Sequence, residues 1–291
     1  MTKHVIEKLS VNVLRVRYYG VRSQGIVPIF FCSDVHIDNP KCDKKLFIDD
    51  MKRAQDRGAL IFIMGDLLDL MQGKKDRRSN KSALKSQFLS DRYINDVIEY
   101  SFKELLPFKD NLAMISNGNH ETSVQNHLEV DVLGMLCRDL QGVGSSVCHL
   151  PYQGWVFFDF MAPEPCVKKY SKKTVRLFYS HGNWHGVISM GTQAIRRYAA
   201  VADADIFVSG DNHERWTAGH ATFRVNKNYE QVVVNQVHLK TGTYKEEFAS
   251  GTGWATEKIG LPKVLGGTTL DMCLKVCKGD YVVDFEVKNR F

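Results

Sequence analysis

The sequence lacks the features that mark several classes of protein. Its 291 residues include only 22 glycines and 7 prolines, too few for a collagen-like or low-complexity chain. No apolar run approaches the ~18–20 residues that cross a bilayer. Residues 1–8 do not form the apolar segment of a secretory signal. With 44% hydrophobic and 25% charged residues, the composition excludes a disordered tail, so we expect a folded cytoplasmic protein without a membrane span.

The patterns of cysteine and charge indicate the compartment and the kind of partner less strongly than composition indicates a folded chain. The 7 cysteines are irregularly spaced, and Cys273 and Cys277 have no second Cys or His pair that would complete a zinc knuckle. Reduced thiols in a cytoplasm fit this pattern. The formal net charge of +6 suits an anionic partner, although many soluble proteins carry as much. The basic segments 74–78 and 168–173 are interpreted first as solvated loops.

Short apolar runs alternate with helical patterns through the first two thirds of the chain. The runs typical of buried strands are 27–32, 59–64, 112–115, 175–179 and 206–208, and an alternating strand is predicted at 11–18. Helices are predicted at 44–57, 84–105, 128–140 and 193–201. After about residue 215 the pattern becomes alternating strands, at 231–239, 270–276 and 281–287. This order predicts an α/β fold with mixed sheets, in a single domain over residues 1–291.

Each of the five buried strands runs directly into a cluster of residues that can bind metal ions. The clusters are Ser33-Asp34-Val35-His36, Gly65-Asp66, Asn117-Gly118-Asn119-His120-Glu121, Ser180-His181-Gly182 and Gly210-Asp211-Asn212-His213. Ligands of open α/β sheets bind outside the carboxyl ends of the strands, so the clusters are expected to converge on one site. Aspartate, histidine and asparagine without thiolates suit divalent ions such as Mn²⁺, Fe²⁺ or Zn²⁺. One carboxylate can bridge two such ions roughly 3.5–4 Å apart.

The order and spacing of these motifs resemble the calcineurin-like metallophosphoesterase superfamily over about residues 27–215. Its stand-alone bacteriophage and bacterial members are the most similar in size, and the DNA-repair exonucleases and Ser/Thr protein phosphatases belong to the same superfamily. The resemblance implies a four-layer αββα sandwich with two mixed β-sheets, in which the C-terminal strands complete the second sheet. It also implies a site for two divalent metal ions.

The resemblance assigns a role to each residue of the motifs. The implied metal ligands are Asp34, His36, Asp66, Asn119, His181, Asp211 and His213. Asp66 would bridge the two ions. Asp211 stands where the family usually has histidine; its carboxylate suits Mn²⁺ or Mg²⁺, and the alternative is that it only hydrogen-bonds a neighbour. We expect Mn²⁺ first, with Mg²⁺, Fe²⁺ or Zn²⁺ as alternatives.

The implied reaction is attack on a phosphate ester by a metal-activated water. His120 would protonate the leaving oxygen as general acid, and Glu121 would orient His120 and raise its pKa. Candidate substrate contacts are Trp184, which could stack on a base, and His185, Arg77 and Arg78, each of which has an alternative interpretation as a surface residue.

These expectations favour a phosphodiesterase or nuclease that acts on DNA, RNA or a nucleotide. Two alternatives stay open. One is a phosphomonoesterase that acts on nucleotides or phosphoproteins. The other is a non-catalytic scaffold with a degenerate metal site, which only the departure at Asp211 supports.

Overall fold

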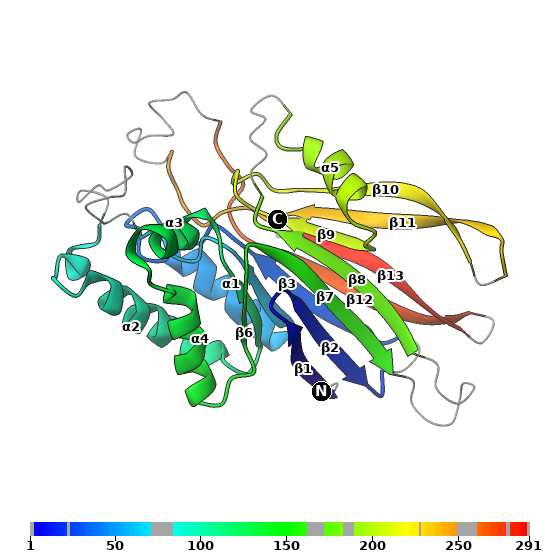
Figure 1. The fold of residues 1–291 in the computed structure, drawn as a ribbon, viewed down its shortest axis with the longest axis horizontal. Coiled ribbons are helices and arrows are strands. Elements are labelled where there is room, and N and C mark those ends of the chain that lie inside the picture. The colour runs from blue at the N-terminus through cyan, green and yellow to red at the C-terminus, as the bar shows by residue number, and fades with distance from the viewer. Residues whose placement is uncertain are drawn as a thin grey trace.

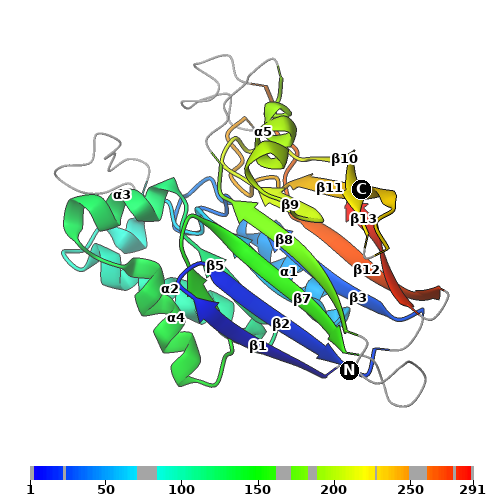
Figure 2. The ribbon, with the colours of Figure 1, turned by 45° about the vertical axis from the view of Figure 1, so that its right-hand side comes forward.

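Two β-sheets lie face to face in the computed structural model, with helices on both outer sides (Figures 1 and 2). The structure describes residues 3–21, 24–70, 84–161, 172–182, 189–226, 228–248, 261–277 and 280–289. The four-layer αββα sandwich with two mixed sheets is therefore confirmed.

The six-stranded sheet contains the buried strands of the first half of the chain. Its strands are β3 (Ile26–Cys32), β4 (Leu60–Met64), β5 (Leu112–Ser116), β6 (Cys148–Leu150), β12 (Thr268–Cys277) and β13 (Asp280–Asn289). In the order β13-β12-β3-β4-β5-β6, strands β3 to β6 run parallel and the other two pairs are antiparallel. Every residue of β4 and β5 is buried, which explains their unbroken apolar sequence.

The seven-stranded sheet is assembled from more distant segments. Its strands are β1 (Lys3–Ser10), β2 (Val13–Tyr19), β7 (Gln153–Met161), β8 (Lys172–Ser180), β9 (Ile206–Ser209), β10 (Trp216–Val225) and β11 (Gln231–Lys240), in the order β1-β2-β7-β8-β9-β11-β10. The C-terminal strands serve both sheets, because β10 and β11 join this one whereas β12 and β13 join the other.

Three apolar clusters separate the four layers. The helices α1 (Lys44–Asp56), α2 (Tyr93–Leu105), α3 (Asn119–Leu128) and α4 (Val132–Gly142) cover the six-stranded sheet, and α5 (Gln193–Val201) covers the other. A central cluster fills the space between the sheets, where Phe62 and Phe158 meet edge to face at 5.8 Å between ring centroids. Side-chain caps begin two of the helices: Asp43 accepts the N–H of Leu46, and Asp131 accepts that of Gly134.

The helix predicted over 84–105 is wrong in its first part. The structure has a short 3₁₀ turn at Ser86–Phe88, and α2 begins only at Tyr93. The hydroxyl of Ser90 accepts the N–H of Arg92, a local bond that competes with helix formation. Phe88 is buried on the same side as α2, which is why the apolar spacing looked continuous. The spacing of apolar residues in the sequence also did not predict β1, β6 or α3.

No helix among the described residues has the length and apolar character needed to cross a membrane.

The cluster between the sheets should provide much of the stability of the fold. Replacing Phe158 by alanine should lower the free energy of unfolding by about 3–5 kcal/mol, because the cavity between two packed sheets cannot collapse fully. Urea denaturation monitored by circular dichroism measures the change. Val11→Ala is the control: Val11 is 75% exposed, and its loss should change stability by less than about 0.5 kcal/mol. Equal effects of the two variants would contradict this account of the core.

Candidate metal centre

The loops that follow the five predicted strands meet at one end of the two sheets. The N–H of Asp34 donates to the carbonyl of Gly65 at 3.1 Å, which joins the loops after β3 and β4. Between the loops after β8 and β9, the N–H of Gly210 donates to the carbonyl of His181 at 2.8 Å. The sheets thus bring together polar clusters that are up to about 180 residues apart in sequence, as their positions at strand ends predict.

The backbone at these loops adopts a conformation that side chains other than glycine rarely take. Ten described non-glycine residues have positive φ, and half of them are predicted ligands: Asp34 (51°), His36 (48°), Asp66 (49°), Asp211 (75°) and His213 (61°). Such residues cost about 1–3 kcal/mol each and persist where the surroundings enforce them, typically at functional sites.

A first group of three side chains can hold a metal ion. Ligand atoms of Asp34, His36 and His213 all lie within 4.8 Å of one another. Asp34 Oδ1 lies 3.5 Å from His213 Nε2, and the rings of His36 and His213 are 5.5 Å apart between centroids. Asp34 and His36 are almost fully buried, whereas the side chain of His213 is 19% exposed. These are the three residues expected at the first metal position.

Asp69 orients His36 within this group. Its Oδ1 lies 2.8 Å from His36 Nδ1, so the opposite nitrogen, Nε2, is left for the centre of the cluster. The other oxygen of Asp69 accepts the side-chain amide of Asn39 at 2.7 Å. A carboxylate behind a histidine in this way fixes the ring and its tautomer, as in many metal sites.

A second group lies around Asp66. Ligand atoms of Asp34, Asp66 and His181 are within 4.8 Å of one another, and His181 Nε2 is 3.3 Å from Asp66 Oδ2. The side-chain oxygen of Asn119 is 3.1 Å from the same nitrogen of His181. Asp66 also belongs to a group with His36 and His120. Its carboxylate therefore lies between the two predicted metal positions.

Asp211 lies beside these groups without joining them. Its backbone N–H donates to Asp34 Oδ2 at 3.0 Å. Its carboxylate does not fall within the three described groups of possible ligands. Ligation by Asp211 therefore stays a prediction.

The prediction that Glu121 orients His120 disagrees with the structure. Both oxygens of Glu121 accept backbone N–H groups: those of Gly118 at 2.9 Å, Leu68 at 2.9 Å and Asp66 at 3.2 Å. Glu121 follows the helix cap Gly118 by three residues, where a glutamate reaches back to the cap. Its role is to hold the loop that carries Asp66.

His120 takes its orientation from Asp69 instead. Its Nδ1 contacts the backbone carbonyl of Asp69, and its Nε2 lies 3.8 Å from Asp66 Oδ2. The His120 side chain is 12% exposed and stands edge-on to the His36 ring at 4.8 Å between centroids. It is thus at the rim of the cluster, with Nε2 turned inward.

Two glycines allow the loops to approach one another closely. A Cβ on Gly118 would lie 2.0 Å from Asp66 Oδ1, and one on Gly65 would lie 2.4 Å from His181 Nδ1. Gly65 also has a φ of 89°. Gly65 and Gly118 are thus required by close packing against the side chains of the site.

The charges of the cluster depend on burial and on the two aspartates. Burial lowers the pKa of His36 and of His213 to about 4. Burial acts in the same direction on His181, but Asp66 and Asp34 oppose it and raise the pKa of His181 to about 10. Without a metal ion, His181 is therefore the cation that neutralises the buried carboxylates.

The residues present fit a metal site. Asp34 Oδ1 and His36 Nε2 are buried and have no hydrogen-bond partner among the described residues. Such atoms are costly inside a protein, and a cation between them would satisfy both. Oxygen and imidazole donors suit divalent ions of the Mn²⁺, Fe²⁺ and Zn²⁺ type.

Four predicted substrate contacts, Arg77, Arg78, Trp184 and His185, lie outside the described residues. The motif analysis did not assign a role to Tyr152, whose hydroxyl donates to the carbonyl of Gly182 and whose ring meets that of His181 edge-on at 5.5 Å between centroids. Tyr152 immediately precedes β7 of the seven-stranded sheet, and none of the sequence motifs includes it.

Comparisons with known proteins give similarities of fold. No protein-family model matches the sequence, and no curated protein matches it either. Among solved structures, Vacuolar Protein Sorting 29 from Cryptosporidium parvum is 14% identical with a TM-score of 0.38, over 91% of this chain and 99% of that chain. A metallophosphoesterase from Sphaerobacter thermophilus is 10% identical with a TM-score of 0.35, over 90% and 89%.

A third similar structure is Vps29 from Entamoeba histolytica in complex with Zn²⁺, which is 11% identical with a TM-score of 0.33, over 90% of this chain and 99% of that chain. Because these TM-scores are low, the chemistry of the site has to be inferred from the residues of this chain.

Metal binding should release a proton from His181. Near neutral pH this histidine is protonated in the metal-free protein, and a metal ion can bind only the neutral ring. Affinity for Mn²⁺ should therefore rise as the pH rises toward about 10. Isothermal titration calorimetry in two buffers of different ionisation enthalpy measures the proton release. In the His181→Gln variant, metal binding should not release this proton. A binding enthalpy that does not depend on the buffer in the wild type would contradict the predicted charge state.

Proposed function

We propose that this protein is a hydrolase of phosphate esters that depends on two divalent metal ions, with the chemistry of the calcineurin-like metallophosphoesterase superfamily. One observation carries the proposal: two overlapping groups of aspartate and histidine side chains, all of them buried except the half-buried His213, share Asp34 and meet where five strands end. The unpartnered buried atoms of Asp34 and His36 support metal ions as the occupants.

The residues divide between two metal positions. Asp34, His36 and His213 would hold one ion, His181 and Asn119 the other, and Asp66 would contact both. The bound ions would neutralise the phosphate oxygens and lower the pKa of the attacking water. The same carboxylate and imidazole donors favour Mn²⁺, with Zn²⁺, Fe²⁺ and Mg²⁺ as alternatives.

His120 would supply the proton to the leaving oxygen. The carbonyl of Asp69 accepts from a protonated Nδ1, so a second proton on the ring is held on Nε2, which faces the cluster near Asp66. The ring lies at the rim, where a leaving group departs toward solvent. No nucleophilic serine or cysteine is required, because the attacking group is water.

We propose a phosphodiester of DNA, RNA or a nucleotide as the substrate. The formal net charge of +6 favours an anionic partner of this kind. The basic segment 74–78 follows the loop of Asp66 in the sequence and contains two arginines, and a guanidinium group can bind phosphate through paired hydrogen bonds.

Replacing His120 should affect substrates according to their leaving groups. For a dinucleotide, whose leaving alkoxide needs a proton, His120→Ala should lower kcat by about 10²–10⁴. For bis-p-nitrophenyl phosphate the loss should be much smaller, because p-nitrophenolate leaves without a proton. His127→Ala, an exposed histidine of the same helix, is the matched control and should leave both rates unchanged.

The same comparison separates proton donation from metal binding, since His120 also lies within ligand distance of His36 and Asp66. If His120 were mainly a metal ligand, its removal would lower both rates by the same factor and reduce the bound metal. That result would contradict its assignment as general acid.

The preference for diesters should show directly in turnover with Mn²⁺. We expect kcat/KM for bis-p-nitrophenyl phosphate to exceed that for p-nitrophenyl phosphate, while Asp66→Asn should remove both activities together with bound metal. Cleavage of the monoester alone would instead identify a phosphomonoesterase. If purified protein neither bound Mn²⁺ nor hydrolysed either ester, the scaffold alternative would be correct and the proposal wrong.

A further inference from the structure

The two sheets of the described chain end in four edge strands, and these strands differ in how well they are protected against pairing with another chain. An exposed edge presents unpaired N–H and C=O groups that can pair with another chain. The edges are β1 and β10 of the seven-stranded sheet and β6 and β13 of the six-stranded sheet. Natural proteins protect such edges with charges, bulges, prolines or short length.

Three of the four edges carry such protection. The strand β6 has only 3 residues. The strand β1 contains Lys3, Glu7 and Lys8, and its pairing with β2 shifts register between Lys8 and Ser10. In β13, Asp284 pairs with Lys275 and Lys288 with Asp271, so ion pairs line that strand.

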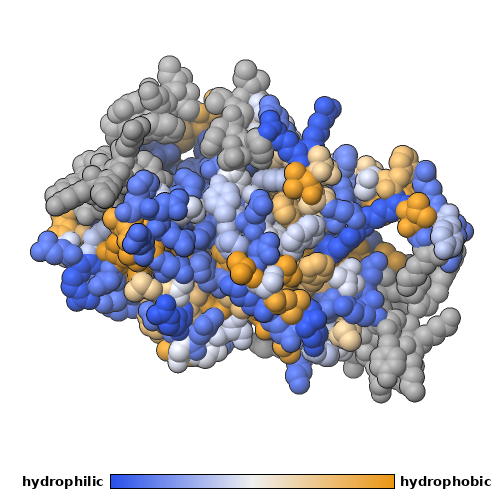
Figure 3. Space-filling view, in the orientation of Figure 1, coloured by the Kyte–Doolittle hydropathy of each residue, from blue (hydrophilic) through white to orange (hydrophobic). Residues whose placement is uncertain are grey.

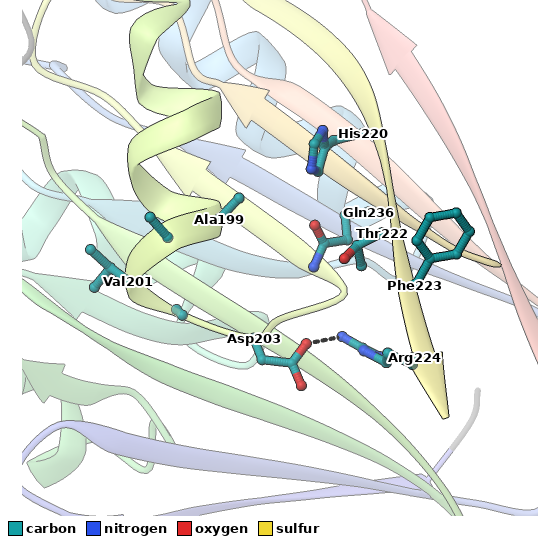
Figure 4. A pocket seen from close by; sticks show the side chains of 10 residues that line it. Ala199, Val201, Asp203, His220, Thr222, Phe223, Arg224 and Gln236 are labelled. Carbon is teal, nitrogen blue, oxygen red and sulfur yellow. Dashed lines mark hydrogen bonds and ion pairs between the residues drawn. The ribbon is translucent and has the colours of Figure 1, made fainter. Parts of the chain in front are cut away.

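The fourth edge, β10, lacks all of these devices. Its 10 residues, Trp216–Val225, include no proline, lysine, aspartate or glutamate, and each residue pairs with β11 without a register shift. Its one charged side chain, Arg224, is already bound to Asp203 (Figure 4) and to Asp205. Along its other side, β10 pairs with none of the described strands.

The two faces of β10 have different characters. On the side of α5, residues such as His220 and Arg224 line a groove of about 420 Å³ (Figure 4). Phe223 also borders this groove, but it alternates with these residues along the strand and carries its ring on the other side of the strand in the same view. On that opposite face Phe223 and Val225 are each 69% exposed, and Val233, which pairs with Phe223 across the hairpin, is 63% exposed.

This apolar face lies on the part of the hairpin that extends from the body of the molecule (Figure 1), where apolar surface is visible in Figure 3. Exposed large apolar residues that form one contiguous set mark interaction surfaces more often than isolated ones do. The set here is joined to an open backbone edge.

We propose that β10 is the interface with a second copy of this chain, which adds its own β10 antiparallel to form one continuous sheet across a twofold axis. The exposed face of the strand reads Thr217, Gly219, Ala221, Phe223 and Val225, so its smallest residue and its largest one lie at equal distances on either side of Ala221. When the strand is turned end to end about Ala221, the largest residue comes to lie against the smallest one.

Antiparallel pairing of the two β10 strands brings specific residues together. With Ala221 on the axis, Phe223 of each copy lies opposite Gly219 of the other, and Val225 lies opposite Thr217. A Cβ on Gly219 would have nothing within 4 Å, so open space is present where the aromatic ring would lie. An aromatic side chain across from a strand glycine is a favourable pair.

Electrostatics favour the same partner. The copies each carry a formal net charge of +6, so their overall charges are of like sign. At β10 no like charges meet, because Arg224 is neutralised within its own chain by Asp203 and Asp205. The uncharged edge is therefore the place where two copies approach at the lowest cost.

Sedimentation velocity over a range of concentrations tests the interface. The wild type should sediment as a dimer at high concentration, and Phe223→Lys should sediment as a monomer at every concentration. Leu9→Lys is the matched control: Leu9 is 50% exposed on β1, the other edge of the same sheet, and this variant should remain dimeric. Circular dichroism and the thermal midpoint show that each variant is folded.

A second variant tests the register. Gly219→Lys leaves the exposed strand position open to solvent in the single chain but places a charge against Phe223 of the other copy, so the fold should be retained while the dimer is lost. A monomeric wild type would overturn the proposal, as would a Phe223→Lys variant that still dimerises. A dimer that survives Gly219→Lys would overturn the pairing of Phe223 with Gly219.

Discussion

The burial of two carboxylates at the same point is the constraint on which the rest of the site depends. Asp34 and Asp66 are at most 2% exposed, and both approach His181, at 3.9 Å and 3.3 Å from its Nε2. Two negative charges without solvent are costly unless cations or hydrogen-bond donors surround them. In the metal-free protein one protonated histidine and a few backbone N–H groups provide that compensation. Metal ions at the same place would do so more completely.

The surrounding carboxylates act on the backbone and thereby fix the geometry of the site. Glu121 binds the N–H groups of Asp66 and Leu68, and Asp38 binds those of Asp69 at 2.6 Å and Leu70 at 3.0 Å. The segment 66–70 is thus held by two buried acids, Glu121 from the first turn of α3 and Asp38 from the loop after β3. Because Asp69 in turn orients both His36 and His120, this segment connects the metal position with the residue at its rim.

The environment, and not the residue type, separates the acids into different roles. Burial, together with the nearby Asp66, raises the pKa of Glu121 to about 7. For Asp66 itself, burial acts upward, but His181 and His120 hold its pKa well below the ordinary value. Asp66 is therefore ionised and suited to bind cations, whereas Glu121 serves as an anchor of the loop.

Sequence reasoning predicted the parts of this structure that depend on local pattern. Unbroken apolar runs gave the central strands, because a strand covered on both faces needs apolar residues at every position. The motifs placed Asp34, His36 and His181 at one end of the sheets for the same reason. Glu121 could not be assigned correctly, because its partners are backbone N–H groups, which every loop offers. The start of α2 was missed because the apolar spacing continues through Phe88, whereas the local bond between Ser90 and the N–H of Arg92 leaves no mark in that spacing.

Anomalous scattering from crystals grown with Mn²⁺ tests the central claim most directly, because it locates each ion without any assumption about activity. The account predicts two manganese peaks, one against Asp34, His36 and His213 and one against His181 and Asn119, with the carboxylate of Asp66 between them. A single peak away from Asp66, or no peak within this cluster, would contradict it.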